Sequence, residues 1–491
     1  MGIIAKQSFY NSVSIALAFL LGAVNTVYLY PTHMGSALQG LVVALLALSN
    51  LVQPFISFGV QYAIIKFYSS CETKEEKDKL LSFSLILPLV VFILLLIITF
   101  FFHHQIIDFI ASENQEMGKY AYLILTVAFS TALFEVFYNW LRIQLYSVFG
   151  NFLKEFFPRA LIFTLLLIYA FEGIGLDGFI MALILGYYLR LFLVVVYSLI
   201  KYTPKFSFAL PIEFKSILRY SLLIFMSGTA ASLILDIDKS MISNILTVEN
   251  VAYYTVAIFI AAVIELPGRA MFQIISPLVA KALNDDDTPT LIKLLKKSAN
   301  NLLLVSGLLF LLINLNLNDF YVWVNLGDYT VALEVVLIVS LGKLFTMSLG
   351  CLNNIITNSK YYAYVFWFST ISAVLAVVLN IYLIQWYGII GAAYATLMVI
   401  VLINFLKIIL VQLRFKINPY SNKTFLSLGV VLLLYLTISR MSFDYTPFVA
   451  LILRSTLITM AYSLLTYLLR LTDDVQQFLG KFYLSPRDLK P

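Results

Sequence analysis

The chain has 491 residues, of which 61% are apolar and only 12% are charged, and its formal net charge at pH 7 is +6. A soluble domain has roughly 45–50% apolar and about 25% charged residues, so this composition excludes a water-soluble fold. The apolar residues occur in runs of about 20, which as helices are long enough to cross the roughly 30 Å hydrocarbon layer of a bilayer.

The sequence therefore predicts an all-α membrane protein with about fourteen transmembrane helices. In chain order, hydropathy places them at residues 8–30, 40–65, 81–102, 120–147, 158–171, 179–200, 218–246, 251–280, 299–315, 331–357, 364–386, 392–413, 424–438 and 447–469. The connections are short, so no soluble catalytic domain is expected. The seventh span contains Ser227-Gly228, two weak helix formers, so the sequence leaves open whether this span is continuous or broken there.

Basic residues gather in alternate connections, such as the one containing Lys74, Lys77 and Lys79, whereas the opposite connection at 172–178 has none. The positive-inside rule then places both termini in the cytoplasm, which requires an even number of spans. Because the basic residues form no continuous stripe, no nucleic-acid partner is expected. The chain's two cysteines are too few and too far apart for a metal centre, so no metal and no cofactor are expected either.

Similar residues recur at an offset of 213 positions. Pro54 corresponds to Pro267, and the hairpin Gly175-Leu-Asp-Gly178 corresponds to Gly388-Ile-Ile-Gly391, where tight turns predict a positive φ at the glycines. Two like-oriented copies of six spans would be related by a pseudo-two-fold axis along the membrane normal, with a cavity between them, as in carriers. The expected divisions are an N-terminal lobe at 1–210, a C-terminal lobe at 211–420, two further spans at 421–470 and a cytoplasmic tail at 471–491.

A charge inside a span costs at least about 2.5–3.5 kcal/mol, so each one calls for a partner or a function. Glu265 and Arg269 lie four residues apart, which favours an ion pair along one helix. Glu135 and Arg142 lie two turns apart on one face, and Arg142 is expected either to pair or to extend to the cytoplasmic surface.

Other cations lack such neighbours. Arg190 is in the middle of a span, and Lys343 has its nearest acid, Glu334, nine residues away. Unpaired cations are not tolerated in a dry bundle, so we expect these two to line a cavity where they face water or an anion. Lys239 lies beside Asp236, where a local salt bridge is the simpler interpretation.

Cations inside a cavity favour an anionic cargo, and arginine in particular suits phosphate. Moving two negative charges out of a negative cytoplasm gains roughly 4–5 kcal/mol per 100 mV, so no ATP-hydrolysing part is required. The sequence contains no Gly-x-x-x-x-Gly-Lys-Ser/Thr motif. The candidate substrate-binding cations are Arg142, Arg190, Lys239, Arg269 and Lys343. The candidate ion-coupling acids are Asp236, Asp238, Glu135 and Glu265.

Three segments also carry a resemblance: Leu235-Asp-Ile-Asp-Lys239-Ser-Met-Ile-Ser, Val251-Ala-Tyr-Tyr-Thr-Val-Ala257 and Tyr387-Gly-Ile-Ile-Gly-Ala-Ala-Tyr-Ala-Thr396. With the span pattern, they resemble the polysaccharide-transport branch of the multidrug/oligosaccharidyl-lipid/polysaccharide exporters, above all O-antigen flippases. The resemblance implies a V-shaped, two-lobed bundle with a cationic central cavity. It implies a polyprenyl-diphosphate-linked glycan as partner, carried on undecaprenyl diphosphate across the bacterial inner membrane by alternating access. Coupling to protons or sodium and contacts with membrane lipid and glycan polymerase machinery are further expectations.

Other functions are less favoured. Lipid II flippases of the same superfamily carry arginines in spans 1 and 2, where this chain has only lysines at the span ends. Drug/cation antiporters use an acid in span 1, whereas Glu135 is the only acid within the first six predicted spans of this chain. A membrane glycan polymerase or ligase usually has a large outer loop with catalytic residues. The longest outer loop here, 103–119, offers His103 and His104 without an ordered acid–base set, so no catalytic residue is expected. The internal repeat disfavours a channel or scaffold.

Overall fold

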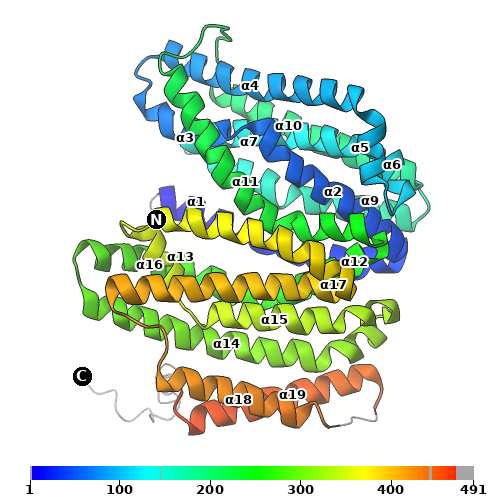
Figure 1. Cartoon of the computed structure of the whole chain (residues 1–491), viewed down its shortest axis with the longest axis vertical. Helices are drawn as coiled ribbons and strands as arrows, with labels where there is room; N and C mark the ends of the chain where they lie inside the picture. The colour runs from blue at the N-terminus through cyan, green and yellow to red at the C-terminus, as the bar shows by residue number, and fades with distance from the viewer. Residues whose placement is uncertain (1–2, 145, 442–444, 472–491) are drawn as a thin grey trace, which may run out of the picture. The chain divides into compact units, whose positions relative to one another are not determined.

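The computed structural model describes residues 3–144, 146–441 and 445–471, and every regular element within these ranges is a helix (Figure 1). The predicted all-α membrane fold is therefore confirmed. The predicted tail at 471–491 lies outside the described residues except for Leu471. The seventh predicted span lies on one continuous helix, although the side chains at 226–235, including that of Ser227, are also outside the description.

The chain divides into two compact units. The first comprises Met1–Val256 and Ala373–Gly388, and the second comprises Ala257–Ser372 and Ile389–Pro491. The six-span lobes and their pseudo-two-fold relation stay a prediction.

Most helices of the first unit come from the first half of the chain. They are α1 (Ile3–Ala23), the π-helix η1 (Val24–Met34), α2 (Gly35–Ser57), α3 (Val60–Phe67), the 3-10 turn η2 (Tyr68–Ser70), α4 (Lys74–Phe101), α5 (His103–Ile110), α6 (Gln115–Lys119), α7 (Tyr122–Ile143), α8 (Ser147–Glu155), α9 (Phe157–Ala170), α10 (Leu176–Lys201) and α11 (Phe214–Ile245). The start of α12 (Val248–Ala262) and the middle of α17 (Ala363–Phe415) also belong to it.

Helix α2 packs against α7, α11 and α4 of this unit, and one glycine within it and one just after it let other helices approach closely. A Cβ atom at Gly40 would lie 1.7 Å from the Val248 carbonyl oxygen, and one at Gly59 would lie 2.4 Å from the Ser221 carbonyl oxygen. Gly59 also has φ +71°, a conformation that glycine adopts at no steric cost, and it separates α2 from α3. These contacts fix α2 against α11 and α12.

The turn between α11 and α12 is held by a side chain from another segment. The Asn114 amide nitrogen donates to the carbonyl oxygens of Ser243 (2.7 Å) and Leu246 (3.1 Å), and its oxygen accepts from the Val248 N–H (2.9 Å). Asn114 is buried, and it satisfies main-chain groups that the two helix ends leave unpaired.

The second unit is built around one long helix. Its elements are the end of α12, η3 (Val263–Glu265), α13 (Leu266–Asn284), α14 (Thr288–Trp323), η4 (Gly327–Ala332), α15 (Leu333–Met347), α16 (Leu352–Asn358), the two ends of α17, α18 (Asn422–Ile438) and α19 (Pro447–Leu468). Figure 1 shows α18 and α19 alongside α14, where Leu303, Leu311, Val431 and Ile458 form an apolar core. The Tyr462 hydroxyl donates to the Leu304 carbonyl oxygen at 2.8 Å and locks this packing.

Every predicted span overlaps a helix, although those at 40–65, 251–280 and 331–357 each extend over more than one helical element. The count of fourteen stays a prediction. In the described part of the chain, nine helical stretches are long and apolar enough to cross a membrane. Two of them, Val13–Ser57 with 45 residues and Ala363–Phe415 with 53, each have the length for two crossings.

The expected positive φ is right for Gly388 and wrong for Gly175, Gly178 and Gly391. Gly388 has φ 59° and ψ −138° and breaks α17, whereas Gly175 has φ −85°. The left-handed residue of the first hairpin is Glu172, with φ 57°, because α9 ends there in a helix cap in which the Gly173 N–H donates to the Ile168 carbonyl oxygen. The helix end, and not the glycine spacing, decides where the chain reverses.

Candidate binding pocket

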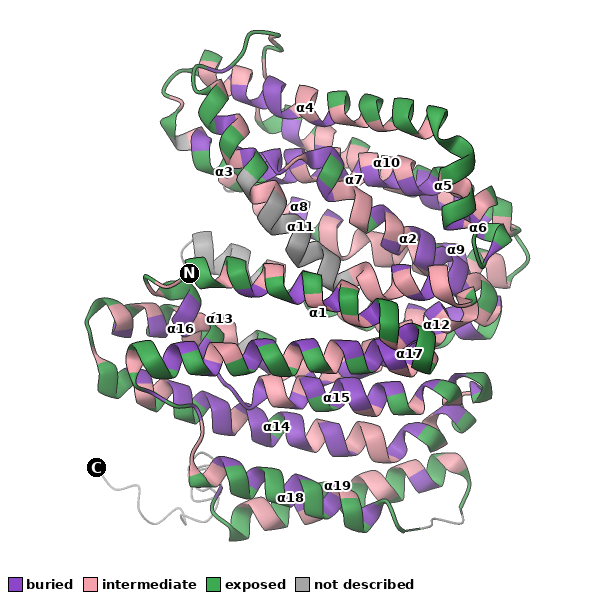
Figure 2. Ribbon diagram, in the orientation of Figure 1, coloured by how far each residue is buried: buried purple, intermediate pink, exposed green. Residues whose placement is uncertain are grey.

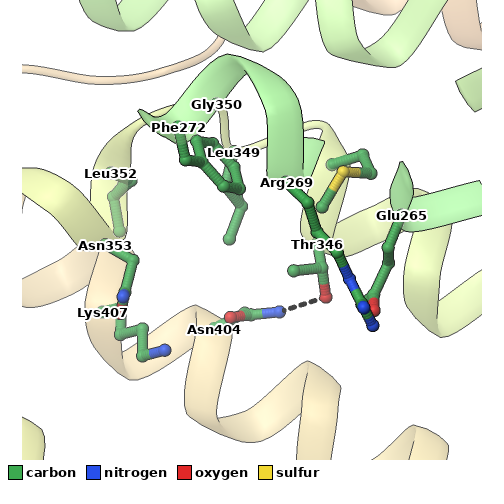
Figure 3. A pocket seen from close by; sticks show the side chains of 11 residues that line it. Glu265, Arg269, Phe272, Thr346, Leu349, Gly350, Leu352, Asn353, Asn404 and Lys407 are labelled. Atoms are coloured by element: carbon green, nitrogen blue, oxygen red, sulfur yellow. Dashed lines mark hydrogen bonds between the residues drawn. The ribbon is translucent and has the colours of Figure 1, made fainter. Parts of the chain in front are cut away.

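The second unit contains a cavity of about 270 Å³ between α13, α15, α16 and the last part of α17 (Figure 3). Phe272 and Met347 contribute apolar surface to its wall. Its polar lining consists of Glu265, Arg269, Thr346, Asn353, Asn404 and Lys407. A cavity with charged and amide groups inside an apolar bundle is a candidate binding site.

Two glycines and a proline shape the cavity. Pro267 lies in the first turn of α13, where its fixed φ suits a helix start. A Cβ at Gly268 would lie 2.6 Å from the Met347 sulfur, so the missing side chain lets α13 approach α15. Gly350 turns the chain with φ +57°, and a Cβ there would lie 2.4 Å from the Ala299 backbone nitrogen.

The carboxylate of the pocket is already paired. Lys343 Nζ lies 3.1 Å from Glu265 Oε1, and the two side chains are 23% and 21% exposed. This corrects two expectations, because Lys343 is not an unpaired cation and Glu265 forms its ion pair across helices and not with Arg269 along its own helix. Packing of α15 beside η3 brings these distant residues together, and no sequence spacing reveals that.

The positive charge of the cavity comes from Arg269 and Lys407. Figure 3 shows them on opposite sides of the pocket. The Asn404 amide nitrogen donates to Thr346 Oγ1 at 3.0 Å, which ties α17 to α15 one turn away from Lys407. With Glu265 held by Lys343, these two cations present a surface suited to a phosphate or another anion.

Lys407 was missed by the sequence analysis. It is the one charged residue in Val401-Leu-Ile-Asn-Phe-Leu-Lys407-Ile-Ile-Leu, which lies inside the predicted span at 392–413. The signal that could have found it is the same cost of an intramembrane charge that identified the other cations.

Arg190 belongs to the first unit and is buried, with 5% exposure. Its guanidinium carbon lies 4.4 Å from the Phe134 ring centroid and 4.7 Å from that of Tyr187, and one terminal nitrogen donates to Thr131 Oγ1 at 3.0 Å. Its Nε has no hydrogen-bond partner among the described atoms. Aromatic faces therefore stabilise this cation in place of the water or anion that the sequence led us to expect.

Glu135 pairs with Lys154 and not with Arg142. Glu135 Oε1 lies 2.7 Å from Lys154 Nζ, while Arg142 is exposed in the last turn of α7. Burial opposes the charge on Lys154, but the attraction of Glu135 outweighs it, so the pKa of Lys154 lies above its ordinary value. The exposed position of Arg142 agrees with the alternative in which it extends to the surface.

The acidic residues of α11 are held by local partners within the first unit. Asp236 forms the predicted salt bridge with Lys239 at 2.6 Å and accepts from the Asn50 amide at 3.1 Å. Asp238 accepts from the Asn380 amide nitrogen at 2.6 Å and from the Tyr254 hydroxyl at 2.7 Å. Both acids and Lys239 therefore have partners within the first unit, and none of the three is among the residues that line the pocket.

Three solved structures resemble the chain. The lipid II flippase MurJ in an inward closed conformation shares 19% identity at a TM-score of 0.71, covering 93% of this chain and 98% of that one. An inward-facing multidrug resistance MATE family transporter of the MOP superfamily shares 16% at 0.58, covering 84% and 94%. A MOP superfamily transporter from Pyrococcus furiosus, whose title describes a reverse polarity of its binding pocket, shares 14% at 0.51, covering 84% and 95%.

These likenesses establish the fold as that of the flippases and transporters of the MOP superfamily. The sequence also matches the family model described as polysaccharide biosynthesis protein over residues 4–267, more than half of the chain. The chain belongs to this polysaccharide biosynthesis family. The resemblance inferred from the sequence is therefore confirmed. A search of curated proteins finds no match.

Proposed function

We propose that the protein is a flippase that moves an oligosaccharide linked to undecaprenyl diphosphate, such as an O-antigen repeat unit, across the bacterial inner membrane. Its family and its MOP fold support membrane transport in polysaccharide biosynthesis. Alternating access between two lobes would let the charged headgroup cross without entering lipid. The protein would act without catalysing a chemical step.

The observation that carries the proposal is the pair of cations in the cavity of the second unit. Arg269 and Lys407 line it, while its carboxylate, Glu265, is engaged by Lys343. A diphosphate offers several anionic oxygens that both cations could bind at once. Lys343 would act by holding Glu265 away from the cargo, so we treat it as a positioning residue.

The remaining charged candidates keep proposed roles. Arg142 would attract the headgroup at the cytoplasmic mouth, and Arg190 would contribute positive potential from the first unit. Lys239 is a weaker candidate, because Asp236 already pairs with it. The proposed ion-coupling acids stay Asp236, Asp238, Glu135 and Glu265, because a protonation or a bound cation at any of them would change the pairing of a membrane-embedded charge.

The test measures movement of a fluorescent undecaprenyl-diphosphate sugar in proteoliposomes. Lys407→Gln and Arg269→Gln should each slow it about 10- to 100-fold, because a hydrogen bond to a charged group contributes about 1.5–3 kcal/mol. Lys407→Arg, which keeps the charge, should retain most of the activity. Lys293→Ala, an exposed lysine on α14, is the matched control and should leave the rate unchanged.

Unchanged transport in both Gln variants would contradict anion binding in this cavity. Competition in the same vesicles separates the finer alternatives. Preferential movement of lipid II would favour a peptidoglycan-precursor flippase, and exchange of a lipophilic cation would favour a drug antiporter. Formation of a longer glycan would indicate a polymerase or ligase.

A further inference from the structure

The connection between α10 and α11, residues 202–213, presents apolar side chains at every second position. The exposed fraction is 67% for Phe206, 94% for Phe208, 59% for Leu210 and 82% for Ile212. Figure 2 colours most of this connection as exposed. Four large exposed apolar side chains so close together in the chain would be a liability in water.

Other residues of the same segment hold it to the first unit. The Ser207 N–H donates to Ser82 Oγ on α4 at 3.1 Å, and Pro211 is buried. At the start of the connection, the Tyr202 hydroxyl donates to Asp78 Oδ1 at 2.7 Å. The segment is thus anchored to protein at these residues, while the four apolar side chains are left uncovered.

The position of the segment limits what can cover this side. It leaves α10, a helix long and apolar enough to span the membrane, at Lys201, which puts its first end close to a membrane boundary. Its other end enters α11 at Phe214, four residues before the predicted seventh span at 218–246. Its backbone is irregular, and an irregular backbone facing hydrocarbon would leave N–H and C=O groups unpaired. The headgroup layer can satisfy those groups while the apolar side chains reach the acyl chains.

The charge around the segment favours acidic lipid. Lys201, Lys205, Lys215 and Arg219 are all exposed, and Lys74 Nζ lies 5.6 Å from the Tyr202 ring centroid. The carboxylates beside the segment are those of Glu213, Glu76 and the buried Asp78. Basic residues beside a membrane are attracted to anionic headgroups, and stable attachment of an interfacial segment usually combines such attraction with apolar insertion.

We propose that residues 202–213 form an interfacial anchor that inserts Phe206, Phe208, Leu210 and Ile212 into the headgroup–acyl boundary of a leaflet containing acidic phospholipid. The anchor fixes the depth of the α10–α11 connection in the bilayer. It goes beyond the proposed transport and holds whichever cargo the protein moves.

Spin labels on single cysteines test the insertion. In a background with Cys71→Ser and Cys351→Ser, labels are placed by Phe208→Cys and Leu210→Cys, with Ser207→Cys on the anchored side and Asp285→Cys in the exposed turn after α13 as controls. The protein is reconstituted in phosphatidylcholine alone and in phosphatidylcholine mixed with phosphatidylglycerol. Collision with oxygen, which concentrates in acyl chains, is compared with collision with a water-soluble nickel complex.

We expect the labels at 208 and 210 to favour oxygen over nickel, with a larger ratio in the phosphatidylglycerol membrane, while the label at 285 favours nickel and the label at 207 is protected from both. Lys205→Glu combined with Lys215→Glu should remove the dependence on phosphatidylglycerol.

Labels at 208 and 210 that collide with nickel as freely as the label at 285 would overturn the proposal. Insertion that is equal in both membranes would overturn the assignment to acidic lipid. Neither readout requires transport, so a failed flippase assay does not affect it.

Discussion

At the scale of single residues, the charges inside the helices divide into those with a protein partner and those that face a cavity. Lys343, Glu135 and Asp236 each form an ion pair with a residue of the described chain. Arg269 and Lys407 line the cavity of the second unit. A membrane-embedded charge that is neutralised by a fixed ion pair is less available to bind a cargo. The cavity cations are therefore the stronger functional candidates.

The Lys343–Glu265 pair is suited to a double-mutant cycle. Lys343→Met and Glu265→Gln should each destabilise the protein more than the double variant does. Lys343→Met leaves the partly buried Glu265 carboxylate without its partner, and Glu265→Gln does the same to the Lys343 ammonium group. We expect a coupling energy of about 1–3 kcal/mol, between the ranges for surface and buried pairs. Reversible unfolding in mixed micelles measures it.

The Lys79–Glu75 pair provides the comparison for that cycle. Its atoms are 2.7 Å apart, but the Glu75 side chain is 75% exposed. An exposed i,i+4 pair contributes about 0.3–0.5 kcal/mol, so its coupling should be clearly smaller. Equal coupling in the two pairs would mean that Glu265 is as solvated as a surface residue.

Arg190 allows its packing role to be separated from its charge. Arg190→Met keeps an unbranched side chain between the Phe134 and Tyr187 rings and removes the cation. Replacing a buried charge by an apolar group of similar size is often neutral for stability, so the variant should fold normally. We expect slower glycolipid transport in proteoliposomes if its positive potential serves the cargo. Normal transport by the folded variant would make Arg190 a structural residue only.

Sequence reasoning found most of these charges but not their partners. Arg190 and Lys343 can be recognised from the sequence because each is a charged residue within a run of apolar residues, and the cost of burying a charge in the membrane is set by its depth there. The partner depends on which helices pack together, which is why Glu265 was assigned to Arg269 and Glu135 was associated with Arg142. Lys407 is a different case, because its charge within a predicted span is visible in the sequence but was not included among the candidate residues.

At the scale of helices, turns are fixed by contacts that come from other segments. The α11–α12 turn depends on Asn114, and α2 fits its neighbours through Gly40. Hydropathy locates the helices because each must match the bilayer thickness. It does not locate these contacts, nor the left-handed Glu172 that ends the α9 cap, because hydropathy carries no information on backbone dihedral angles.

Asn114→Ala should destabilise the protein by about 1–3 kcal/mol, because it leaves the carbonyl groups of Ser243 and Leu246 and the N–H of Val248 without their buried partner. Unfolding in mixed micelles measures the loss.

Asn250→Ala is the control for that change, since its amide forms only an exposed hydrogen bond to Thr247, and its effect should be within about 0.5 kcal/mol. If the two variants were equally stable, the Asn114 hydrogen bonds would not hold the turn.

At the scale of the whole molecule, composition was the most informative property of the sequence. Large apolar side chains remain exposed on helices of both units, for example Leu94 and Phe100 on α4 and Met460 and Leu464 on α19 (Figure 2). Such surfaces suit lipid, and they explain why 61% apolar residues excluded a soluble fold from the start. Composition does not specify the cargo, because the cargo is chosen by a few side chains.

Membrane orientation is the prediction that belongs to this scale. Green fluorescent protein fused after Pro491 should fluoresce, and alkaline phosphatase fused in the 172–175 connection should be active, because the basic connections favour the cytoplasm and this connection lacks Lys and Arg. Active phosphatase at the C-terminal fusion would contradict both the orientation and the even number of spans.

The Asn114 hydrogen bonds also impose an order on assembly during synthesis. Asn114 precedes Ser243 by 129 residues. At a translation rate of about 5–20 residues per second, it leaves the ribosome roughly 6–26 s before its acceptor exists. The hydrogen bonds that hold the α11–α12 turn therefore form only after the later helices have been synthesised, with a segment of the chain that was made well before them.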